Sequence, residues 1–258
     1  MSVLVSTLSD GILTMMLNRP EVYNSFNREM ALAVQADLEQ ASEDPLVRCI
    51  VLTGAGKAFC AGQDLNEVVD PEGPALRDIV GNHYNPIIRL LRGIEKPVVA
   101  AVNGVAAGAG ANIALACDVV VASSTAAFIQ AFSKIGLIPD SGGTYTLPRL
   151  IGWQRASALI MLGDKVPAAE AEEMGMIYKC VEEADFEATV AALANRLAKL
   201  PTRGLGLTKR ALNQSVTNDL DSQLAVEEEL QFLAGNTYDY GEGVKSFLEK
   251  RKPEFRGE

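Results

Sequence analysis

Asp140 is the residue of this 258-residue sequence whose surroundings raise the sharpest chemical question. It stands in SKIGLIPDSGG (133–143), after an apolar stretch and a proline and before a serine and two glycines. One interpretation is a helix cap, because residues 141–150 predict a short amphipathic helix and Asp accepts hydrogen bonds from the free N–H groups of a first turn. The other is a general base. The local residues alone favour the cap.

Other groups that do acid–base or nucleophilic chemistry are scarce. His83 is the one histidine, and its flanks, GNHYN, contain neither a nucleophile elbow nor an HExxH pair, so it is interpreted as a surface or packing residue. Cys60 lies in a glycine-rich loop without an evident base, which favours a packed cysteine over a nucleophile. The four cysteines form no CxxC pair, so no metal site is predicted. General base chemistry is therefore left to a carboxylate.

Two glycine-rich passages each follow a predicted strand. They are IVLTGAGKAFCAGQDL (50–65) and VAAVNGVAAGAGAN (99–112). Neither has the register of GxGxxG nor the full spacing of a P-loop. Tight packing of a helix on a sheet explains one such passage. Two passages at the ends of two strands indicate a pair of backbone N–H donors that converge on one point, which is the arrangement of an oxyanion hole.

The elements that must position these groups are an α/β series followed by helices. A hairpin is predicted over Val3–Leu8 and Ile12–Leu17, around a Ser-Asp-Gly turn. Hydrophobic periodicity then predicts buried strands and amphipathic helices. The strands are Cys49–Thr53, Val98–Val102 and Val119–Ala122, and the helices are Asn27–Ser42, Asn85–Ile94, Trp153–Leu162, Ala168–Met174, Phe186–Lys199, Leu205–Gln214, Asp219–Leu233 and Tyr240–Lys250.

Composition limits the classes of function. The chain is 48% hydrophobic and 22% charged, as expected of a soluble protein with a sizeable core. Its net charge of −10 argues against nucleic acid as a partner. No apolar run approaches the ~20 residues of a membrane span, so no membrane partner is expected. The N-terminus lacks the features of a signal peptide, which predicts a cytoplasmic protein.

Four segments together resemble the crotonase, or enoyl-CoA hydratase/isomerase, superfamily. They are LNRPEVYNSF (17–26), FCAGQDL (59–65), NGVAAGAGA (103–111) and GLIPDSGGT (136–144), in the family's order and over nearly the whole chain. The resemblance implies an α/β fold with a spiral core of ββα repeats in residues 1–200. It implies a C-terminal helical region, residues 201–258, that builds a homo-oligomer, a trimer or a dimer of trimers. It also implies an acyl-CoA substrate, with no separate cofactor because CoA is part of the substrate.

The resemblance implies which residues act. The backbone N–H groups of Gln63 and Ala109 are expected to hold the thioester oxygen. Hydratases of the family carry two glutamates, and the register places Asn112 and Phe132 at those positions, so water addition is disfavoured. Asp140 stands where the hydratases have glycine. This pattern resembles the isomerase branch and favours Asp140 as the acid/base, although it can cap a helix as well.

Several substrates and roles stay open. The resemblance favours isomerisation of the ring epoxide of phenylacetyl-CoA to the seven-membered oxepin. Alternatives are a Δ3,Δ2-enoyl-CoA isomerase, a hydratase, and a non-catalytic acyl-CoA-binding protein.

The ionisation of Asp140 also stays open. A helix N-terminus beside Asp140 would lower the pKa of its carboxyl group, and apolar walls would raise it.

Further substrate contacts are expected near these segments. Phe132, Ile138, Leu137 and Tyr145 are candidates for the wall of the acyl pocket, with ordinary core packing as an equal alternative. Asn112 is a candidate for orienting the substrate. Contacts to the CoA phosphates are predicted at Lys57, Arg19 and, from a neighbouring subunit, Lys250. The remaining predicted contacts are Ala61, Asp64, Leu65 and Gly110.

Overall fold

The computed structural model describes residues 2–258, and its chain begins with the predicted hairpin. Strands β1 (Leu4–Ser9) and β2 (Ile12–Leu17) pair antiparallel around Asp10 and Gly11, whose φ angles of 51° and 78° are those of a type I′ turn. Parallel strands then extend the sheet in the order β1-β2-β3-β5-β7-β10. These strands are β3 (Cys49–Gly54), β5 (Val98–Val102), β7 (Val119–Ser123) and β10 (Lys179–Val181).

A second, smaller sheet was not predicted, and two of its strands, β4 and β6, lie within the two glycine-rich passages. Its strands, in the order β4-β6-β8-β9, are β4 (Ala58–Cys60), β6 (Val105–Ala107), β8 (Ala127–Ile129) and β9 (Lys165–Pro167). Strands β4, β6 and β8 each follow a strand of the larger sheet, which is the repeating ββα spiral that the resemblance implied. Three-residue strands of mostly small, buried residues leave no alternating pattern to recognise.

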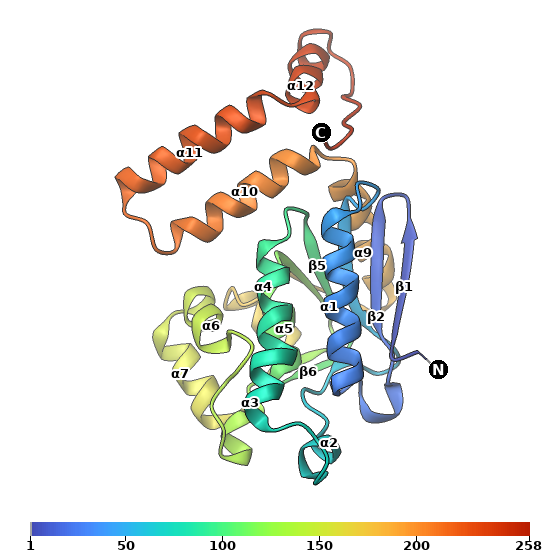
Figure 1. The fold of residues 1–258 in the computed structure, drawn as a ribbon, viewed down its shortest axis with the longest axis vertical. Helices are drawn as coiled ribbons and strands as arrows, with labels where there is room; N and C mark the ends of the chain where they lie inside the picture. Colours follow the sequence, from blue (N-terminus) through green and yellow to red (C-terminus); the bar gives the residue numbers. More distant parts are fainter. Residues whose placement is uncertain (1) are drawn as a thin grey trace.

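The two faces of the larger sheet are buried against different helices (Figure 1). Because side chains alternate along a strand, Ile50 and Leu52 of β3 join one core with the helices α1, α4 and α5, whereas Cys49 and Val51 pack toward α9. Both faces are covered, so these strands are continuous apolar runs. The helices are α1 (Arg28–Glu43), α4 (Asn85–Gly93), α5 (Ala109–Ala116) and α9 (Glu183–Ala198).

Shorter elements connect these layers. Before α4, the chain forms a π-helix, η2 (Ile79–Tyr84), which periodicity did not predict. After β8, the chain turns through a 3₁₀ segment into α6, whose N-terminus lies beside α5. The short helices are η1 (Pro20–Val22), α2 (Leu65–Val69), α3 (Leu76–Asp78), η3 (Ala131–Ile135), α6 (Gly143–Ile151), α7 (Trp153–Leu162) and α8 (Ala168–Glu173).

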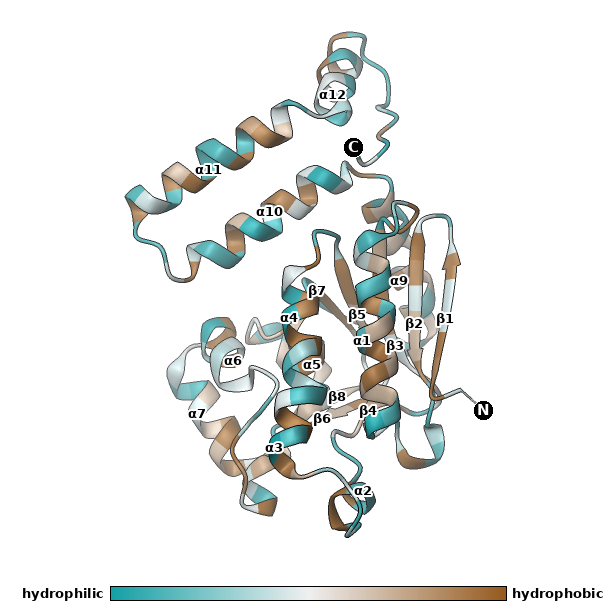
Figure 2. Ribbon diagram, viewed as in Figure 1, coloured by the Kyte–Doolittle hydropathy of each residue, from teal (hydrophilic) through white to brown (hydrophobic). Residues whose placement is uncertain are grey.

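The last three helices project away from the sheets (Figure 1). They are α10 (Thr202–Ser215), α11 (Leu220–Gly235) and α12 (Tyr238–Leu248), within three residues of the predicted bounds. Figure 2 shows apolar residues along them, and Phe232 and Phe247 are 71% and 83% exposed. Apolar surface of this kind in one chain is typical of a protein–protein contact.

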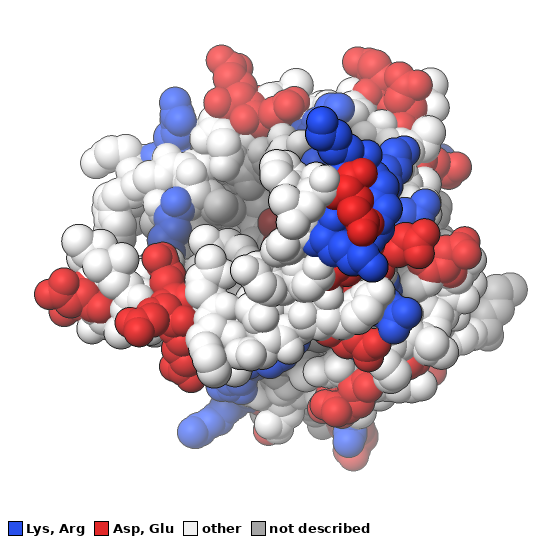
Figure 3. Space-filling view, turned by 90° about the horizontal axis from the view of Figure 1, so that it is seen from above, with Lys and Arg blue, Asp and Glu red and all other residues white. Residues whose placement is uncertain are grey.

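Charge on this end of the molecule is mixed. Arg203 and Arg210 both pair with Glu95, and Figure 3, which views the molecule from above, shows a group of Lys and Arg side chains with acidic ones among and around them. The basic side chains on this face therefore do not form the continuous positive surface that binds the phosphate backbone of a nucleic acid. Among the helices of residues 2–258, none combines the length and the apolar character that a membrane span needs.

Candidate active site

Asp140 lies in the turn that leads into α6, but it does not cap that helix. The N-cap of α6 is Gly142, with φ 73° and no side-chain cap, so the cap interpretation is wrong. The preceding Ser141 is also left-handed, with φ 51°, and it donates from Oγ to Asp140 Oδ1 at 2.9 Å. Two left-handed residues in succession separate the Asp140 carboxyl group from the free N–H groups of the first helical turn.

Burial dominates the ionisation of Asp140. It raises the pKa of the carboxyl group from 3.8 to about 6, against the hydrogen bonds from Ser141 Oγ and from the backbone N–H of Asp140, which lower it. The sequence left open whether a helix N-terminus would lower the pKa of Asp140 or burial would raise it. In the structure the effect of burial is the larger. A carboxylate with a pKa near 6 is ionised at neutral pH and is a stronger base than an exposed Asp, which suits proton transfer.

The two glycine-rich loops lie against one another. Gly62 has φ 96°, and a Cβ atom built on it would lie 3.0 Å from the carbonyl oxygen of Ala107 and 3.6 Å from the nitrogen of Ala109. Ala109 is the first residue of α5, where backbone N–H groups have no partner within the helix. Within residues 2–258, neither the Gln63 N–H nor the Ala109 N–H donates a hydrogen bond. Two free donors from adjacent loops are what an oxyanion hole requires.

The side chain of Gln63 connects its loop to the π-helix. Tyr84 Oη donates to Gln63 Oε1 at 2.7 Å, and Gln63 Nε2 donates to Glu67 Oε2 at 2.8 Å. The Tyr84 side chain is fully buried. Burial, then the charges of Cys60, Asp140 and Glu67, raise the pKa of the Tyr84 phenol well above its ordinary value. The sequence analysis missed Tyr84, because neither spacing nor a motif points to it.

Asn112 holds the turn that carries Asp140. Its Nδ2 donates to the main-chain carbonyl of Asp140 at 2.9 Å, and its Oδ1 accepts from Gln130 Nε2 at 2.8 Å. Asn112 and Gln130 are buried, with exposed fractions of 1% and 5%. Gln130 is a second residue that the sequence analysis missed, because its partner is remote in sequence.

The predicted pocket walls differ in burial. Phe132 is buried, and its ring lies 3.8 Å from the Cβ position of Gly108, beside the start of α5. Leu137, Tyr145 and Leu65 are exposed, and Ile138 is 81% exposed. The structure therefore places Phe132 next to the candidate oxyanion hole, whereas these four residues lie on the surface of the single chain.

The residues predicted to contact CoA do not form one group. Arg19 is paired with Asp64 at 2.9 Å and donates to the carbonyl of Ser25, so its guanidinium already has partners. Asp64 also caps α2. Lys57 is exposed beside the first glycine-rich loop, and Lys250 follows α12, at the other end of the molecule from α2 (Figure 1). Lys250 is thus remote from α2 within one chain, and its contact with CoA stays a prediction.

Two further predicted contacts, Ala61 and Gly110, lie one in each of the two glycine-rich passages. Ala61 is exposed and donates its N–H to the carbonyl of Tyr23. Gly110 faces Cys60, because a Cβ atom built on it would lie 2.4 Å from the Cys60 carbonyl oxygen. The geometry therefore gives Gly110 a packing role at the junction between the loops, and its contact with substrate stays a prediction.

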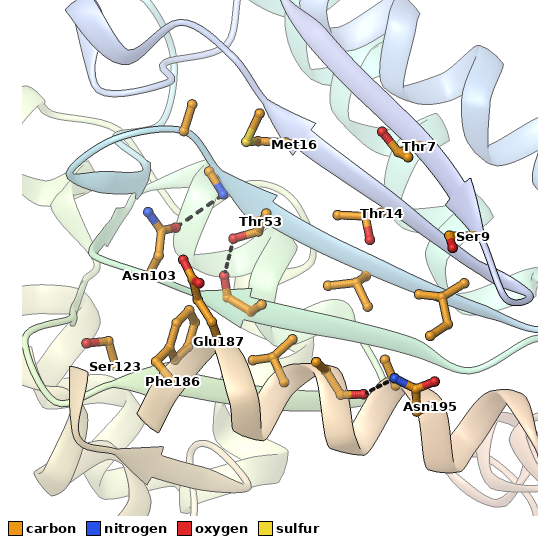
Figure 4. Close-up of a pocket in the computed structure, with 18 of the residues that line it drawn as sticks. Thr7, Ser9, Thr14, Met16, Thr53, Asn103, Ser123, Phe186, Glu187 and Asn195 are labelled. Atoms are coloured by element: carbon orange, nitrogen blue, oxygen red, sulfur yellow. Dashed lines mark hydrogen bonds between the residues drawn. The ribbon is translucent and has the colours of Figure 1, made fainter. Parts of the chain in front are cut away.

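A large groove lies elsewhere. It has a volume of about 830 Å³ and runs between α9 and the face of the larger sheet that α9 covers, and Asp140, Gln63 and Ala109 do not line it. Figure 4 shows its hydroxyl and amide side chains, including Thr14, Thr53 and Asn103. Thr53 Oγ1 donates to the carbonyl of Ala101 at 2.9 Å, and Asn103 Oδ1 accepts from the N–H of Gly54 at 3.2 Å. Its position across the sheet from α5 separates it from the chemical groups described above.

His83 and Cys60 are packing residues. His83 is buried, its Nδ1 has no hydrogen-bond partner among the described residues, and burial lowers its pKa. Burial raises the pKa of the Cys60 thiol to about 12. Among residues 2–258, no three His, Cys, Asp or Glu side chains gather as they would around a metal ion.

The buried thiol makes a prediction about reactivity. Because the thiolate is the reactive form, Cys60 is expected to resist an alkylating reagent at pH 8 in the folded protein, whereas the partly exposed Cys180 reacts first. Mass spectrometry of peptides after timed alkylation measures both rates, with urea-unfolded protein as the control. Rapid labelling of Cys60 in the folded protein would contradict its assignment as a packing residue.

Comparisons with known proteins identify the family of the chain. The family model described as enoyl-CoA hydratase/isomerase matches residues 7–258. The chain is 51% identical to the 1,2-epoxyphenylacetyl-CoA isomerase of Escherichia coli (strain K12), over 100% of this chain and 99% of that protein. It is 45% identical to a protein of Rhodobacter capsulatus named "Probable enoyl-CoA hydratase", over 97% of this chain and 96% of that one. The crystal structure of an enoyl-CoA hydratase from Bacillus anthracis superposes with a TM-score of 0.92 at 32% identity, covering 99% and 100% of the two chains.

Proposed function

Because this chain belongs to the enoyl-CoA hydratase/isomerase family, we propose that it is a CoA-thioester isomerase that converts the ring epoxide of phenylacetyl-CoA to the oxepin-CoA. The observation that carries the proposal is Asp140, a half-buried carboxyl group whose pKa is raised by burial to about 6. Asn112 and Phe132 occupy the positions that the family resemblance gives to the two hydratase glutamates, and neither side chain transfers protons. A single base suits the movement of one proton better than the addition of water.

The proposed mechanism is a proton shuttle. The thioester oxygen binds between the N–H groups of Gln63 and Ala109, which stabilise the negative charge that develops on it. Ionised Asp140 removes a proton from the carbon next to the thioester, and the electron pair passes into the enolate. The carbon–carbon bond shared by the epoxide and the six-membered ring breaks, its electron pair joins the double bonds of the ring, and the two fused rings become the seven-membered oxepin. Asp140 returns the proton farther along the conjugated chain. No atom is gained or lost.

Lys57 and, from a neighbouring subunit, Lys250 are the basic residues that we propose for the CoA phosphates. Arg19 is less available, because it is paired with Asp64. The exposed apolar residues of α10–α12 support a homo-oligomer built through these helices, a trimer or a dimer of trimers. Four free cysteines fit the reducing cytoplasm. No cofactor is invoked, because the chemistry needs only a base and the oxyanion donors.

A second candidate function is the Δ3,Δ2-isomerisation of straight-chain enoyl-CoA. The same observation supports it, because removal of a proton at C2 and its return at C4 also needs one carboxylate and two N–H donors. The two functions differ in the shape of the acyl group, and one protein can perform both.

The test of the proposed function is conversion of both thioesters in deuterated buffer, followed by NMR. The proposal expects faster turnover of the ring epoxide, with deuterium entering the product at the position of reprotonation. Preference for the straight 3-enoyl chain would favour the second candidate. Water addition to a 2-enoyl-CoA at a comparable rate would favour a hydratase. Binding of both thioesters with no isomerisation and no proton exchange would leave a non-catalytic acyl-CoA-binding protein.

The pH dependence of the reaction follows from the ionisation of Asp140. The base must start ionised, so kcat/KM is expected to be constant at high pH and to fall about tenfold per pH unit below about pH 6. Initial rates between pH 4.5 and 8 measure this limb, and a substrate-free incubation at each pH controls for loss of folded protein. A limb near pH 4, or a flat profile through pH 5, would mean that another group is the base.

A further inference from the structure

We propose that Asn112 and Gln130 are positioning residues that fix the turn of Asp140 relative to the oxyanion donor Ala109, an inference that rests on the proposed function. The hydrogen bonds run from Gln130 Nε2 to Asn112 Oδ1 at 2.8 Å and from Asn112 Nδ2 to the Asp140 carbonyl at 2.9 Å. They join the end of β8, the helix α5 and the turn before α6, which are three separate segments of the chain. We call this pair of hydrogen bonds the amide relay.

The amide relay ties the base and the oxyanion donor to one helical turn. Asn112 lies in the first turn of α5, where its N–H donates to the carbonyl of Gly108 at 3.2 Å. Ala109 begins the same turn. A helical turn is rigid, so the hydrogen bond from Asn112 to the Asp140 carbonyl sets the base at a fixed position relative to the Ala109 N–H. Relative placement of reacting groups controls rate, and a shift of about 1 Å can cost ~10²-fold.

Close packing supports this role. A Cβ atom built on Gly143 would lie 2.3 Å from Asn112 Nδ2, so a residue without a side chain lets the amide reach the turn. Asparagine also fits the chemistry, because it donates to one neighbour and accepts from the other. A carboxylate at position 112 cannot donate to the Asp140 carbonyl. A glutamate at position 112, as the resemblance gives for the hydratases, would therefore remove the hydrogen bond that holds the Asp140 turn.

The relay is not optimised for stability. Gln130 Oε1 is buried and has no hydrogen-bond partner among the described residues. A buried polar group without a partner destabilises a fold, and an incompletely satisfied network is worse than an apolar one. A function in positioning accounts for a network that stability alone would not favour.

The test compares Asn112→Ala, Gln130→Met and the double variant with wild type on the same thioester. Asn112→Ala removes both hydrogen bonds, and kcat is expected to fall about 10- to 100-fold while KM changes less than about threefold. Gln130→Met keeps the side-chain volume and removes one donor, so a smaller fall in kcat is expected. Because the two residues act through one chain of bonds, the double variant should lose no more than Asn112→Ala alone.

Ser123→Ala is the matched control. Ser123, the last residue of β7, is also a buried polar residue, with an exposed fraction of 1%, but its hydroxyl shares a hydrogen bond with that of Thr125 and lies outside the relay. Wild-type kcat in Ser123→Ala together with the expected losses supports the proposal. Wild-type kcat in both Asn112→Ala and Gln130→Met overturns it, as does a loss confined to KM. If Asp140→Asn is inactive in the same assays while the relay variants are fully active, the relay inference fails and the proposed function stands.

Discussion

Asp140→Asn is expected to lower kcat for isomerisation by about 10²–10⁴-fold, the usual contribution of a general acid–base group. The amide is nearly isosteric with the carboxyl group and can still accept the hydrogen bond that Ser141 Oγ donates at 2.9 Å. It cannot take a proton from carbon. The oxyanion donors and the acyl pocket are unchanged, so the Kd for acyl-CoA is expected to stay within a few-fold of wild type.

The same substitution is expected to stabilise the fold at neutral pH. Burial raises the pKa of Asp140 from 3.8 to about 6, so the unfolded chain holds the ionised form more readily than the folded protein does. The resulting destabilisation is absent below pH 3.8 and fully present above about pH 6. Removing the charge should therefore raise the free energy of unfolding at pH 7.5 by on the order of 1–3 kcal/mol, and by much less at pH 4.5.

Urea unfolding of both proteins at these two pH values measures the stability difference. The NMR assay in deuterated buffer measures isomerisation and proton exchange, and calorimetry with a saturated acyl-CoA measures binding. Loss of catalysis with intact binding and greater stability at pH 7.5 identifies a half-buried base whose charge is kept for function. An Asp140→Asn variant that isomerises at the wild-type rate would place the base elsewhere.

Gly110→Ala is expected to produce the second largest loss, by separating the oxyanion donors. The added Cβ atom would lie 2.4 Å from the Cys60 carbonyl oxygen and 2.7 Å from Cys60 Sγ, so α5 has to move away from the first glycine-rich loop. Ala109, the residue before it, moves with the helix. Loss of one correctly placed donor lowers kcat by about 10²–10³-fold, and overpacking lowers the free energy of unfolding by roughly 1–3 kcal/mol.

The matched control is Gly93→Ala, at the end of α4, where an added Cβ atom meets nothing within 4 Å. Rates should be normalised to the folded fraction, measured by circular dichroism, so that partial unfolding is not mistaken for a catalytic loss. A folded Gly110→Ala variant with wild-type kcat would show that the Gln63 and Ala109 N–H groups do not need this spacing.

Local sequence determined most of the longer helices and strands of the fold. Asn27 accepts from the Met30 N–H at 3.0 Å and so begins α1, whose apolar residues recur at helical spacing. The Asp10-Gly11 turn determined the hairpin. These features depend on neighbours within one turn of chain, which is why propensity and periodicity predict them. The resemblance to the family then predicted the ββα spiral and the candidate site residues, because the glycines and acidic residues of its motifs occupy fixed positions in that fold.

Tertiary structure decided how the candidate residues interact. Asn112 meets Asp140 across 28 residues of sequence, and Tyr84 meets Gln63 across 21, so no local pattern records either contact. The left-handed Ser141 and Gly142 remove Asp140 from the cap position that its sequence suggested. Its pKa depends on burial, which is a property of the assembled core. The sequence alone supplied a carboxylate and two glycine-rich loops; packing of α5 against both determines whether they can act together.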